Sequence, residues 1–180
     1  MSNLVIRRAT ADDITVLAAL IEGFASGHPA QDHPRSIDRM REAFFGHEPL
    51  GCVLLAENKR TALGFAIWRK TYDVFWSMYG GDGLGLYVGP SHRGFGIALC
   101  LIAAMCLDIQ QQGGQFVQTT YNPELAPLYE RVGVGRVEHA CHVSAAAFER
   151  LAALAGKPAR EIIRGLPDKT LNFTRTTLAK

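Results

Sequence analysis

The chain has 180 residues, of which 48% are hydrophobic and 20% are charged, and these values fit one globular domain with a sizeable core. The formal net charge of +2 is too small to indicate a nucleic acid or an anionic membrane as a partner. No apolar run approaches the length of a membrane-spanning helix, and the first residues are not typical of a secretory signal. We therefore expect a single domain over residues 1–180, in the cytoplasm, with its four cysteines as reduced thiols.

The N-terminal part predicts one strand and two helices. Residues 4–10 are typical of a short strand, and Thr10 to Asp13 are expected to cap the first helix with an acidic first turn. After a loop, Ser36 is expected to cap a second helix that ends at Phe45. The buried face of the first helix is expected to consist of Ile14, Leu17, Ala18 and Ile21.

Two strands are predicted next, at residues 51–57 and 62–72. Gly64 inside the second strand predicts a bulge or a close approach of two backbones. The glycine-rich segment 80–83 is expected to be a turn that leads into a central strand at 84–88. Antiparallel strands followed by a strand–helix–strand unit predict a mixed sheet.

The segment after the central strand predicts a site for an anion. The chain turns sharply at Gly89–Pro90, passes through a loop with Gly94 and Gly96, and enters a helix whose apolar residues have the spacing of a buried face. The first N–H groups of a helix point the same way as the positive end of its dipole, which favours a phosphate or pyrophosphate. The glycines let the backbone approach such a group, and Arg93 adds a permanent cation.

The rest of the chain predicts further alternation of strands and helices, and residues 145–180 extend beyond the core that the earlier elements form. The expected features, in chain order, are a helix end at 113–114, a strand at 116–120, a loop and short helix at 122–129, a strand within 134–143, a helix at 147–155 and a strand at 171–177.

Two motifs resemble those of the GCN5-related N-acetyltransferases (GNAT). The loop reads Arg93-x-x-Gly96-x-Ala98, which is similar to the acetyl-coenzyme A loop of that family, Arg/Gln-x-x-Gly-x-Gly/Ala. The two motifs also occur in the order that the family shows. The second signature of the family is matched at the expected spacing by Asn122, Leu128, Tyr129, Glu130 and Gly133.

The resemblance implies an α/β (α+β) fold of three layers, with helices flanking a mixed, twisted central sheet. It implies one N-acetyltransferase domain, in which the strands at 84–88 and 116–120 separate and the pantetheine arm of acetyl-CoA lies between them. The residues that the resemblance assigns to acetyl-CoA are Leu86, Tyr87, Val88, Arg93, Gly94, Phe95, Gly96, Ile97, Ala98, Asn122 and Tyr129.

Direct attack of an amine on a thioester needs a neutral amine, a donor for the developing oxyanion and a proton for the leaving thiolate. The resemblance and the chemistry both favour Tyr129 as the catalytic residue, acting as the acid that protonates the thiolate. The base stays open among a water chain and four side chains, Glu57, Asp82, Tyr87 and His92.

Within the family, residues 41–46, 54–57 and 64–67 are similar to the diamine (spermidine/spermine-type) acetyltransferases. In that subgroup the central strand ends in an acidic pair before Leu-Tyr-Val. This chain has Leu84 and Gly85 at those positions, so neither carboxylate is present and the identity of the amine stays open.

The remaining candidates are weaker. The six histidines show no metal-ligand spacing, so no metal is expected. Four aromatic residues beside the central strand predict either an aromatic wall for the acceptor or packing within a hairpin; they are Tyr72, Phe75, Trp76 and Tyr79.

The leading hypothesis is an acetyl-CoA-dependent N-acetyltransferase, an acyltransferase that acts on the primary amine of a small molecule. The alternatives are a protein or peptide N-acetyltransferase and a non-catalytic acyl-CoA-binding module. The alternating segment at 171–177 predicts either completion of the sheet edge or exchange with a partner, and we expect a homodimer.

Overall fold

The computed structural model describes residues 3–26, 35–120, 122, 126–137 and 140–166, and within them seven strands form one mixed sheet. In chain order the strands are β1 (Leu4–Arg8), β2 (Cys52–Asn58), β3 (Thr61–Asp73), β4 (Met78–Val88), β5 (Phe116–Thr120), β6 (Gly135–Val137) and β7 (Ala140–Ser144). Their order across the sheet is β1-β2-β3-β4-β5-β7-β6. Only the β4–β5 pair is parallel among these strands.

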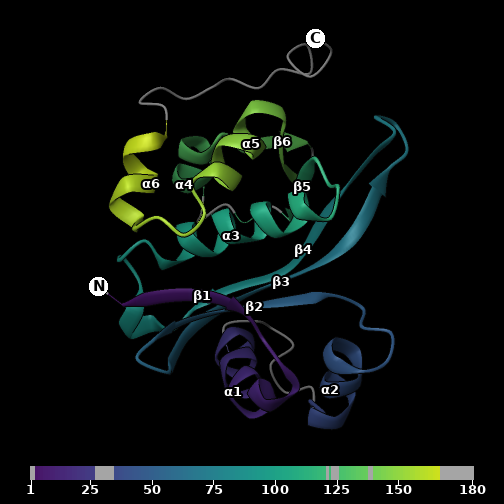
Figure 1. The fold of residues 1–180 in the computed structure, drawn as a ribbon, viewed down its shortest axis with the longest axis vertical. Helices are drawn as coiled ribbons and strands as arrows, with labels where there is room; N and C mark the ends of the chain where they lie inside the picture. Colours follow the sequence, from purple (N-terminus) through teal and green to yellow (C-terminus); the bar gives the residue numbers. More distant parts are fainter. Residues whose placement is uncertain (1–2, 27–34, 121, 123–125, 138–139, 167–180) are drawn as a thin grey trace.

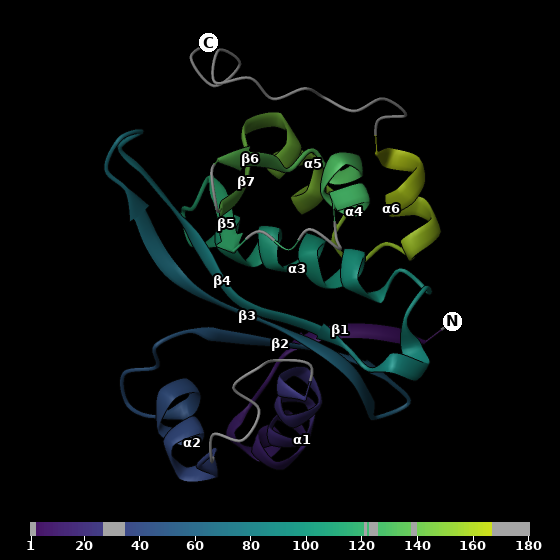
Figure 2. The ribbon, with the colours of Figure 1, turned by 180° about the vertical axis from the view of Figure 1, so that it is seen from behind.

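Helices cover both faces of the sheet (Figures 1 and 2). The helices are α1 (Ile14–Ala25), α2 (Ile37–Phe45), α3 (Ile97–Gln111), α4 (Ala126–Val132), α5 (Ala145–Ala153) and α6 (Ala159–Gly165), with two 3₁₀ turns, η1 (Ala11–Asp13) and η2 (Pro90–His92). One face carries α1 and α2, and the other carries the remaining helices around α3. This arrangement confirms the mixed sheet flanked by helices that the sequence predicts.

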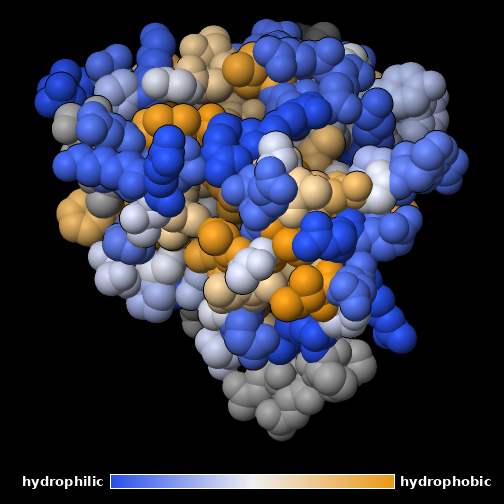
Figure 3. Space-filling view, turned by 60° about the horizontal axis from the view of Figure 1, so that its bottom comes forward, coloured by the Kyte–Doolittle hydropathy of each residue, from blue (hydrophilic) through white to orange (hydrophobic). Residues whose placement is uncertain are grey.

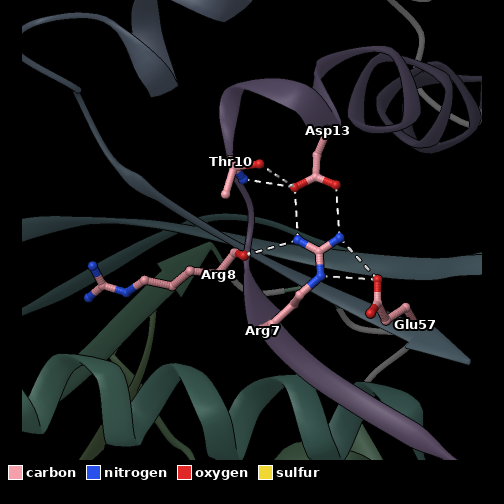
Figure 4. Close-up of polar contacts among 5 residues, drawn as sticks. All are labelled: Arg7, Arg8, Thr10, Asp13 and Glu57. Carbon is pink, nitrogen blue, oxygen red and sulfur yellow. Dashed lines mark hydrogen bonds and ion pairs between the residues drawn. The ribbon is translucent and has the colours of Figure 1, made fainter. Parts of the chain in front are cut away.

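The first helix is connected to the sheet by Arg7, which bonds two carboxylates. The Arg7 guanidinium donates to both carboxylate oxygens of Asp13 at 2.8 Å and to Glu57 Oε2 on β2 at 3.1 Å (Figure 4). Asp13 also accepts the backbone N–H of Thr10 at 2.8 Å, which completes the expected cap. Because of the Arg7 bonds, and then the Thr10 bond, the pKa of the Asp13 carboxyl lies well below its ordinary value.

We expect this cluster to make stability sensitive to acid. The folded-state pKa of Asp13 is depressed, so its contribution is present above the unfolded value of about 3.9 and is lost as the pH falls toward the folded-state pKa. Asp13→Asn should lower the free energy of unfolding by roughly 1–2 kcal/mol at pH 7, the range for loss of a helix cap. Urea unfolding at pH 7 and pH 3 checks this.

The matched control for that prediction is Asp12→Asn, on the exposed neighbouring residue. We expect Asp12→Asn to stay within about 0.5 kcal/mol of the wild type at both pH values. The difference between Asp13→Asn and the wild type should shrink at pH 3, because the Asp13 carboxyl of the unfolded wild type is then mostly protonated, whereas that of the folded state is still ionised. An equal difference at the two pH values would contradict the assignment.

The glycines at 80–83 lie inside β4, so the turn expected there is wrong. The turn lies instead between β3 and β4, where Asp73 Oδ1 accepts the N–H groups of Phe75 and Trp76 at 2.9 Å and Ser77 has a φ of 53°. The glycines are present because side chains from other elements occupy the space that a Cβ would take. A Cβ at Gly80 would lie 2.6 Å from the Phe116 ring, and one at Gly81 would overlap Ile109.

The core consists of two clusters, one on each face of the sheet. The α1 side contains Leu17, Val53, Leu55, Phe65 and Ile67, with part of Tyr87 packed against them. The α3 side is larger and includes most of α3 together with residues of α5 and α6. The elements C-terminal to residue 144 therefore contribute to the same core as α3.

The larger cluster contains one buried carboxylate, Asp108 on α3, which is 7% exposed. Its Oδ2 accepts the indole N–H of Trp68 at 3.0 Å, and its Oδ1 accepts Arg8 Nε at 2.9 Å. Both oxygens therefore have donors, which a buried carboxylate requires. The bonds of Asp108 therefore connect β1, β3 and α3.

The second half of the chain departs from prediction in two places. The single strand expected within 134–143 is two paired strands, β6 and β7. A further helix, α6, follows the Gly156–Pro158 connection and buries Ile162 and Leu166. The loop expected at His28–Arg35 and the strand expected at 171–177 lie largely or wholly outside the described residues.

Two further features concern environment. No helix among the described residues has both the length and the apolarity to span a membrane. Cys52, Cys100 and Cys106 are free thiols, and burial raises the pKa of the Cys106 thiol to about 12.

Candidate functional site

The pairing of the two central strands ends beside a bulge in β4. The parallel pairing of β4 with β5 runs from Gly81–Val117 to Gly83–Thr119, and in the described residues it goes no further. On its other edge, β4 pairs with β3 through Gly83 and Gly85, so Leu84 is an extra residue in the ladder. A bulge bends a strand and increases its twist. Among the described residues, the backbone of β4 from Leu84 to Val88 has no pairing with β5, which ends at Thr120.

The loop after β4 presents backbone donors at the start of α3. Gly94 has a φ of 81°, and no atom lies within 4 Å of the position its Cβ would take. Gly96 is the N-cap of α3, with a φ of 79°. The first intrahelical bond runs from the N–H of Cys100 to Gly96 O, so the N–H groups of the first turn are available for an anion.

Arg93 is exposed and contacts the end of β4. Its Nε donates to Val88 O at 3.0 Å, and its guanidinium carbon lies 5.8 Å from the centre of the Tyr87 ring. Arg93 thus connects the loop to β4. Phe95, between the two glycines, is 59% exposed.

Helix α6 packs against the loop. A Cβ at Gly96 would overlap the Cβ of Ala159 at the start of α6, so glycine is required at 96 for space as well as for its positive φ. Cys100 on α3 lies near the same connection, with Sγ 3.8 Å from Lys157 O. Sequence reasoning missed this contact, because nothing local in the chain indicates that residue 159 meets residue 96.

Helix α4 carries Tyr129, and both ribbon views place it beside α6 on the α3 side of the sheet (Figures 1 and 2). The Tyr129 side chain is half-buried, and its carbonyl accepts the N–H of Val134 at 2.8 Å. Asn122 is exposed just after β5. The two residues of the second motif therefore lie on the β5 side of the strand separation, and the loop lies on the β4 side.

The two faces of β4 differ beyond the bulge. Leu86 and Val88 pack against the α3 cluster, whereas Tyr87 packs against the α1 cluster. A Cβ at Gly85 would be 3.3 Å from the Phe65 ring and 3.9 Å from the Phe24 ring. Gly85 and Tyr87 therefore share the α1 face. Phe24, at the end of α1, is an element of this face that sequence reasoning did not single out.

The base candidates fall into two groups. Glu57 is bonded to Arg7 in the cluster at β1, and Asp82 accepts from Arg69 Nε at 3.0 Å. Both carboxylates therefore have arginine partners. Tyr87 and His92 are half-buried in β4 and in η2, on either side of the exit from the central strand.

The aromatic residues of the β3–β4 hairpin lie at its tip, away from the bulge. Tyr72 and Tyr79 face each other across the two strands with ring centres 5.0 Å apart, and Phe75 contacts Trp76 at 4.9 Å. Tyr79 is five positions from Leu84, which is about 16 Å along a strand. This geometry favours packing within the hairpin over an aromatic wall for the acceptor. In the described residues, no three potential metal-ligating side chains form a group.

Comparisons with known proteins bear on the family and the fold of the chain. Residues 17–134 match the model of the Acetyltransferase (GNAT) family. A comparison with curated proteins gave no match.

Several solved structures share the fold. One is an aminoglycoside acetyltransferase from an uncultured soil metagenomic sample in complex with sisomicin, at TM-score 0.63 and 15% identity over 77% of this chain and 94% of that one. Another is a ribosomal-protein-alanine N-acetyltransferase from Brucella melitensis biovar Abortus 2308. Its TM-score is 0.62, with 20% identity over 75% of this chain and 93% of that one. A third is a candidate acetyltransferase from Salmonella typhimurium with its cofactor acetyl-CoA. Its TM-score is 0.62, with 15% identity over 78% of this chain and 93% of that one.

Proposed function

Because the chain belongs to the GNAT acetyltransferase family, and is thus an N-acetyltransferase that uses acetyl-CoA, we propose that its acceptor is the primary amine of a small molecule. The observation that carries this proposal is the end of the β4–β5 pairing at the Leu84 bulge, which leaves the rest of β4 unpaired with β5 near the donors at the start of α3. The open space at Gly94 and the first-turn N–H groups of α3 fit the pyrophosphate of acetyl-CoA.

Acetyl-CoA supplies a thioester whose carbonyl carbon accepts the amine. Overall, a C–N bond forms and a C–S bond breaks, the amine gives up one proton, and the leaving sulfur gains one. In our proposal Arg93 and the backbone from Gly94 to Ala98 hold the phosphates, and the backbone at Leu86 and Val88 holds the pantetheine arm. A backbone N–H of β4 stabilises the negative charge that develops on the carbonyl oxygen.

Two side chains complete the proposed site. The hydroxyl of Tyr129 donates the proton to the leaving sulfur, and Asn122 orients the arm from the β5 side. The amine proton leaves through Tyr87, His92 or water. Asp82 and Glu57 are weaker candidates for this task, because each carboxylate is bonded to an arginine.

The test has a binding arm and a transfer arm. Calorimetry and thermal shift with acetyl-CoA should show binding by the wild type. Release of CoA thiol should then rise above slow hydrolysis for at least one small primary amine in a panel that also contains peptides with free N-termini. Binding without transfer to any amine would support a non-catalytic acyl-CoA-binding module, and transfer only to peptides would support the protein acetyltransferase alternative.

We further propose that the protein is a cytoplasmic homodimer. The free cysteines are compatible with the cytoplasm. For the dimer, the support is the alternating sequence at 171–177, which is typical of a strand that pairs at a sheet edge.

Removal of residues 167–180 tests the dimer. The cut falls after Leu166 because this residue is buried in the core. We expect the shortened chain to have half the solution mass of the wild type or to aggregate, as measured by light scattering after size-exclusion chromatography. Unchanged mass with normal solubility would contradict a role for this segment in assembly.

A further inference from the structure

Two exposed apolar side chains lie at the bulge of β4 and at the end of α1. Phe24 at the end of α1 is 44% exposed, and Leu84 in the bulge is 45% exposed. Figure 3 shows the side of the molecule that carries α1 and α2, where apolar side chains reach the surface in several places among polar ones. Because water-exposed large apolar side chains beside a reaction centre often contact substrate, these residues need an explanation beyond core packing.

Phe24 belongs to a group of three rings. Its ring centre lies 5.9 Å from Phe65 and 6.2 Å from Tyr87, and Phe65 lies 6.0 Å from Tyr87. Phe24 meets both of the other rings edge to face, an arrangement that aromatic pairs prefer. Phe65 is buried, so it supports the group from inside, while Phe24 remains partly open to solvent.

Two glycines give this group its shape. A Cβ at Gly23 would lie 2.5 Å from the Tyr87 hydroxyl oxygen, so glycine on α1 lets the tyrosine reach the helix backbone. A Cβ at Gly85 would lie 3.3 Å from the Phe65 ring and 3.9 Å from the Phe24 ring. Glycine at 85 therefore leaves room beside the partly exposed Phe24 ring.

The charges around the group oppose a polycationic ligand. The Arg93 guanidinium is already placed over the Tyr87 ring. The acidic residues nearest in sequence to Phe24 and Tyr87 are Glu22 and Asp82, and each has an arginine partner. Glu22 is paired with Arg35 at 2.8 Å, and Asp82 is paired with Arg69 at 3.0 Å. A second ammonium group on the acceptor would be repelled by Arg93. Neither Glu22 nor Asp82 would offset this repulsion, because an arginine already neutralises each of them.

We propose that the acceptor is a monoamine with an aromatic ring, which lies against Phe24 and Tyr87 on the α1 side of β4 with its amino group toward the bulge. Leu86 and Val88 fill the α3 side of the same stretch, which leaves the α1 side for the acceptor. This inference rests on the proposed acetyl transfer and adds the class of amine and the residues that select it.

The first test compares 2-phenylethylamine, butylamine and spermidine in the thiol-release assay. The wild type should give a kcat/KM for 2-phenylethylamine about tenfold above that for butylamine, the scale of an aromatic contact, and higher still than that for spermidine. A preference for spermidine would overturn the inference while leaving acetyl transfer intact. Failure to bind acetyl-CoA would overturn the proposed function and this inference together.

The second test uses Phe24→Leu, which keeps apolar bulk against Phe65 but removes the ring. We expect kcat/KM for 2-phenylethylamine to fall about tenfold and that for butylamine to stay within about twofold, because only the first has a ring to lose. Phe75→Ala, on an exposed ring at the hairpin tip, is the matched control and should change neither value. An equal loss for both amines, or no loss, would overturn the inference.

A third measurement does not depend on turnover. With CoA present, 2-phenylethylamine should raise the melting temperature of the wild type and not that of Phe24→Ala, whereas spermidine should raise neither. Leu84→Glu adds a carboxylate at an exposed position of the bulge and should create a response to spermidine. Absence of any response to 2-phenylethylamine in the wild type would overturn the inference.

Discussion

Gly96→Ala is expected to lower the affinity for acetyl-CoA by roughly 100-fold, the effect of losing one or two hydrogen bonds to a charged group. Two physical effects act at this position. The φ of 79° costs an L-residue about 1–2 kcal/mol, and the added methyl overlaps the Cβ of Ala159. Relief of the overlap must move either α6 or the loop, and movement of the loop takes the first-turn N–H groups of α3 out of position.

A second substitution separates the two effects. In Gly96→Ala combined with Ala159→Gly the two methyl groups no longer meet, so the melting temperature should recover in part. If affinity for acetyl-CoA, measured by calorimetry, also recovers, the overlap with α6 is what displaces the loop. If affinity stays low, the positive φ at 96 is itself essential for the anion contact.

The matched control is Gly113→Ala at the opposite end of α3. Gly113 has a φ of 83° and no atom within 4 Å of its Cβ position, so the variant carries the same strain without an overlap. It should lose stability but keep its affinity for acetyl-CoA. Arg93→Ala should weaken binding more modestly, because the backbone donors remain. Unchanged affinity in Gly96→Ala would refute the loop as the phosphate site.

Tyr129→Phe is expected to lower kcat by about 10²–10⁴-fold while leaving the affinity for acetyl-CoA nearly unchanged. The hydroxyl would act mainly in the transition state, when the sulfur departs and needs a proton. The ring is half-buried in α4, and Phe keeps its volume, so the fold should survive. Thiol release with the best amine measures kcat, and calorimetry measures the affinity for acetyl-CoA.

Tyr79→Phe provides the matched control, because Tyr79 is 66% exposed in the hairpin and distant from the bulge. It should leave kcat within about twofold of the wild type. A Phe variant with undiminished turnover would remove Tyr129 from the mechanism.

The elements with strong local signals were predicted well from the sequence. The strand at 116–120 agrees with the structure to the residue, and Ser36 caps α2 by accepting the N–H of Arg39. The cap at Thr10 and Asp13 and the helix end at Gly113–Gly114 also follow from local chemistry. Each depends on residues within one or two turns of the chain.

The errors arose where contacts with residues distant in sequence determine the local structure. Gly80 and Gly81 suggested a turn, but they are glycines because Phe116 and Ile109 occupy the adjacent space. Helix α6 has only seven residues and depends on burial of Ile162 for its place, so local periodicity did not indicate it. Local sequence does not contain these contacts.

The candidate site shows the same division. The loop glycines and the start of α3 follow from spacing and from the family resemblance, whereas the bulge at Leu84 was not predicted. Sequence alone did not show that Arg7 and Arg69 neutralise two of the four side chains considered as a base. It also did not bring Phe24 to Tyr87, because the two rings are 63 positions apart and meet only through the docking of α1 on the sheet.

The bond from Trp68 to Asp108 bears on how the chain folds as it leaves the ribosome. The two residues are 40 positions apart, so at about 5–20 residues per second Asp108 is synthesised roughly 2–8 s after Trp68. The β2–β3 hairpin can form in microseconds and thus long before α3 exists. For seconds, therefore, the nascent half-sheet presents an uncovered apolar face and an indole N–H without its carboxylate. During this interval the exposed apolar face is most prone to bind a chaperone or to aggregate with another nascent chain.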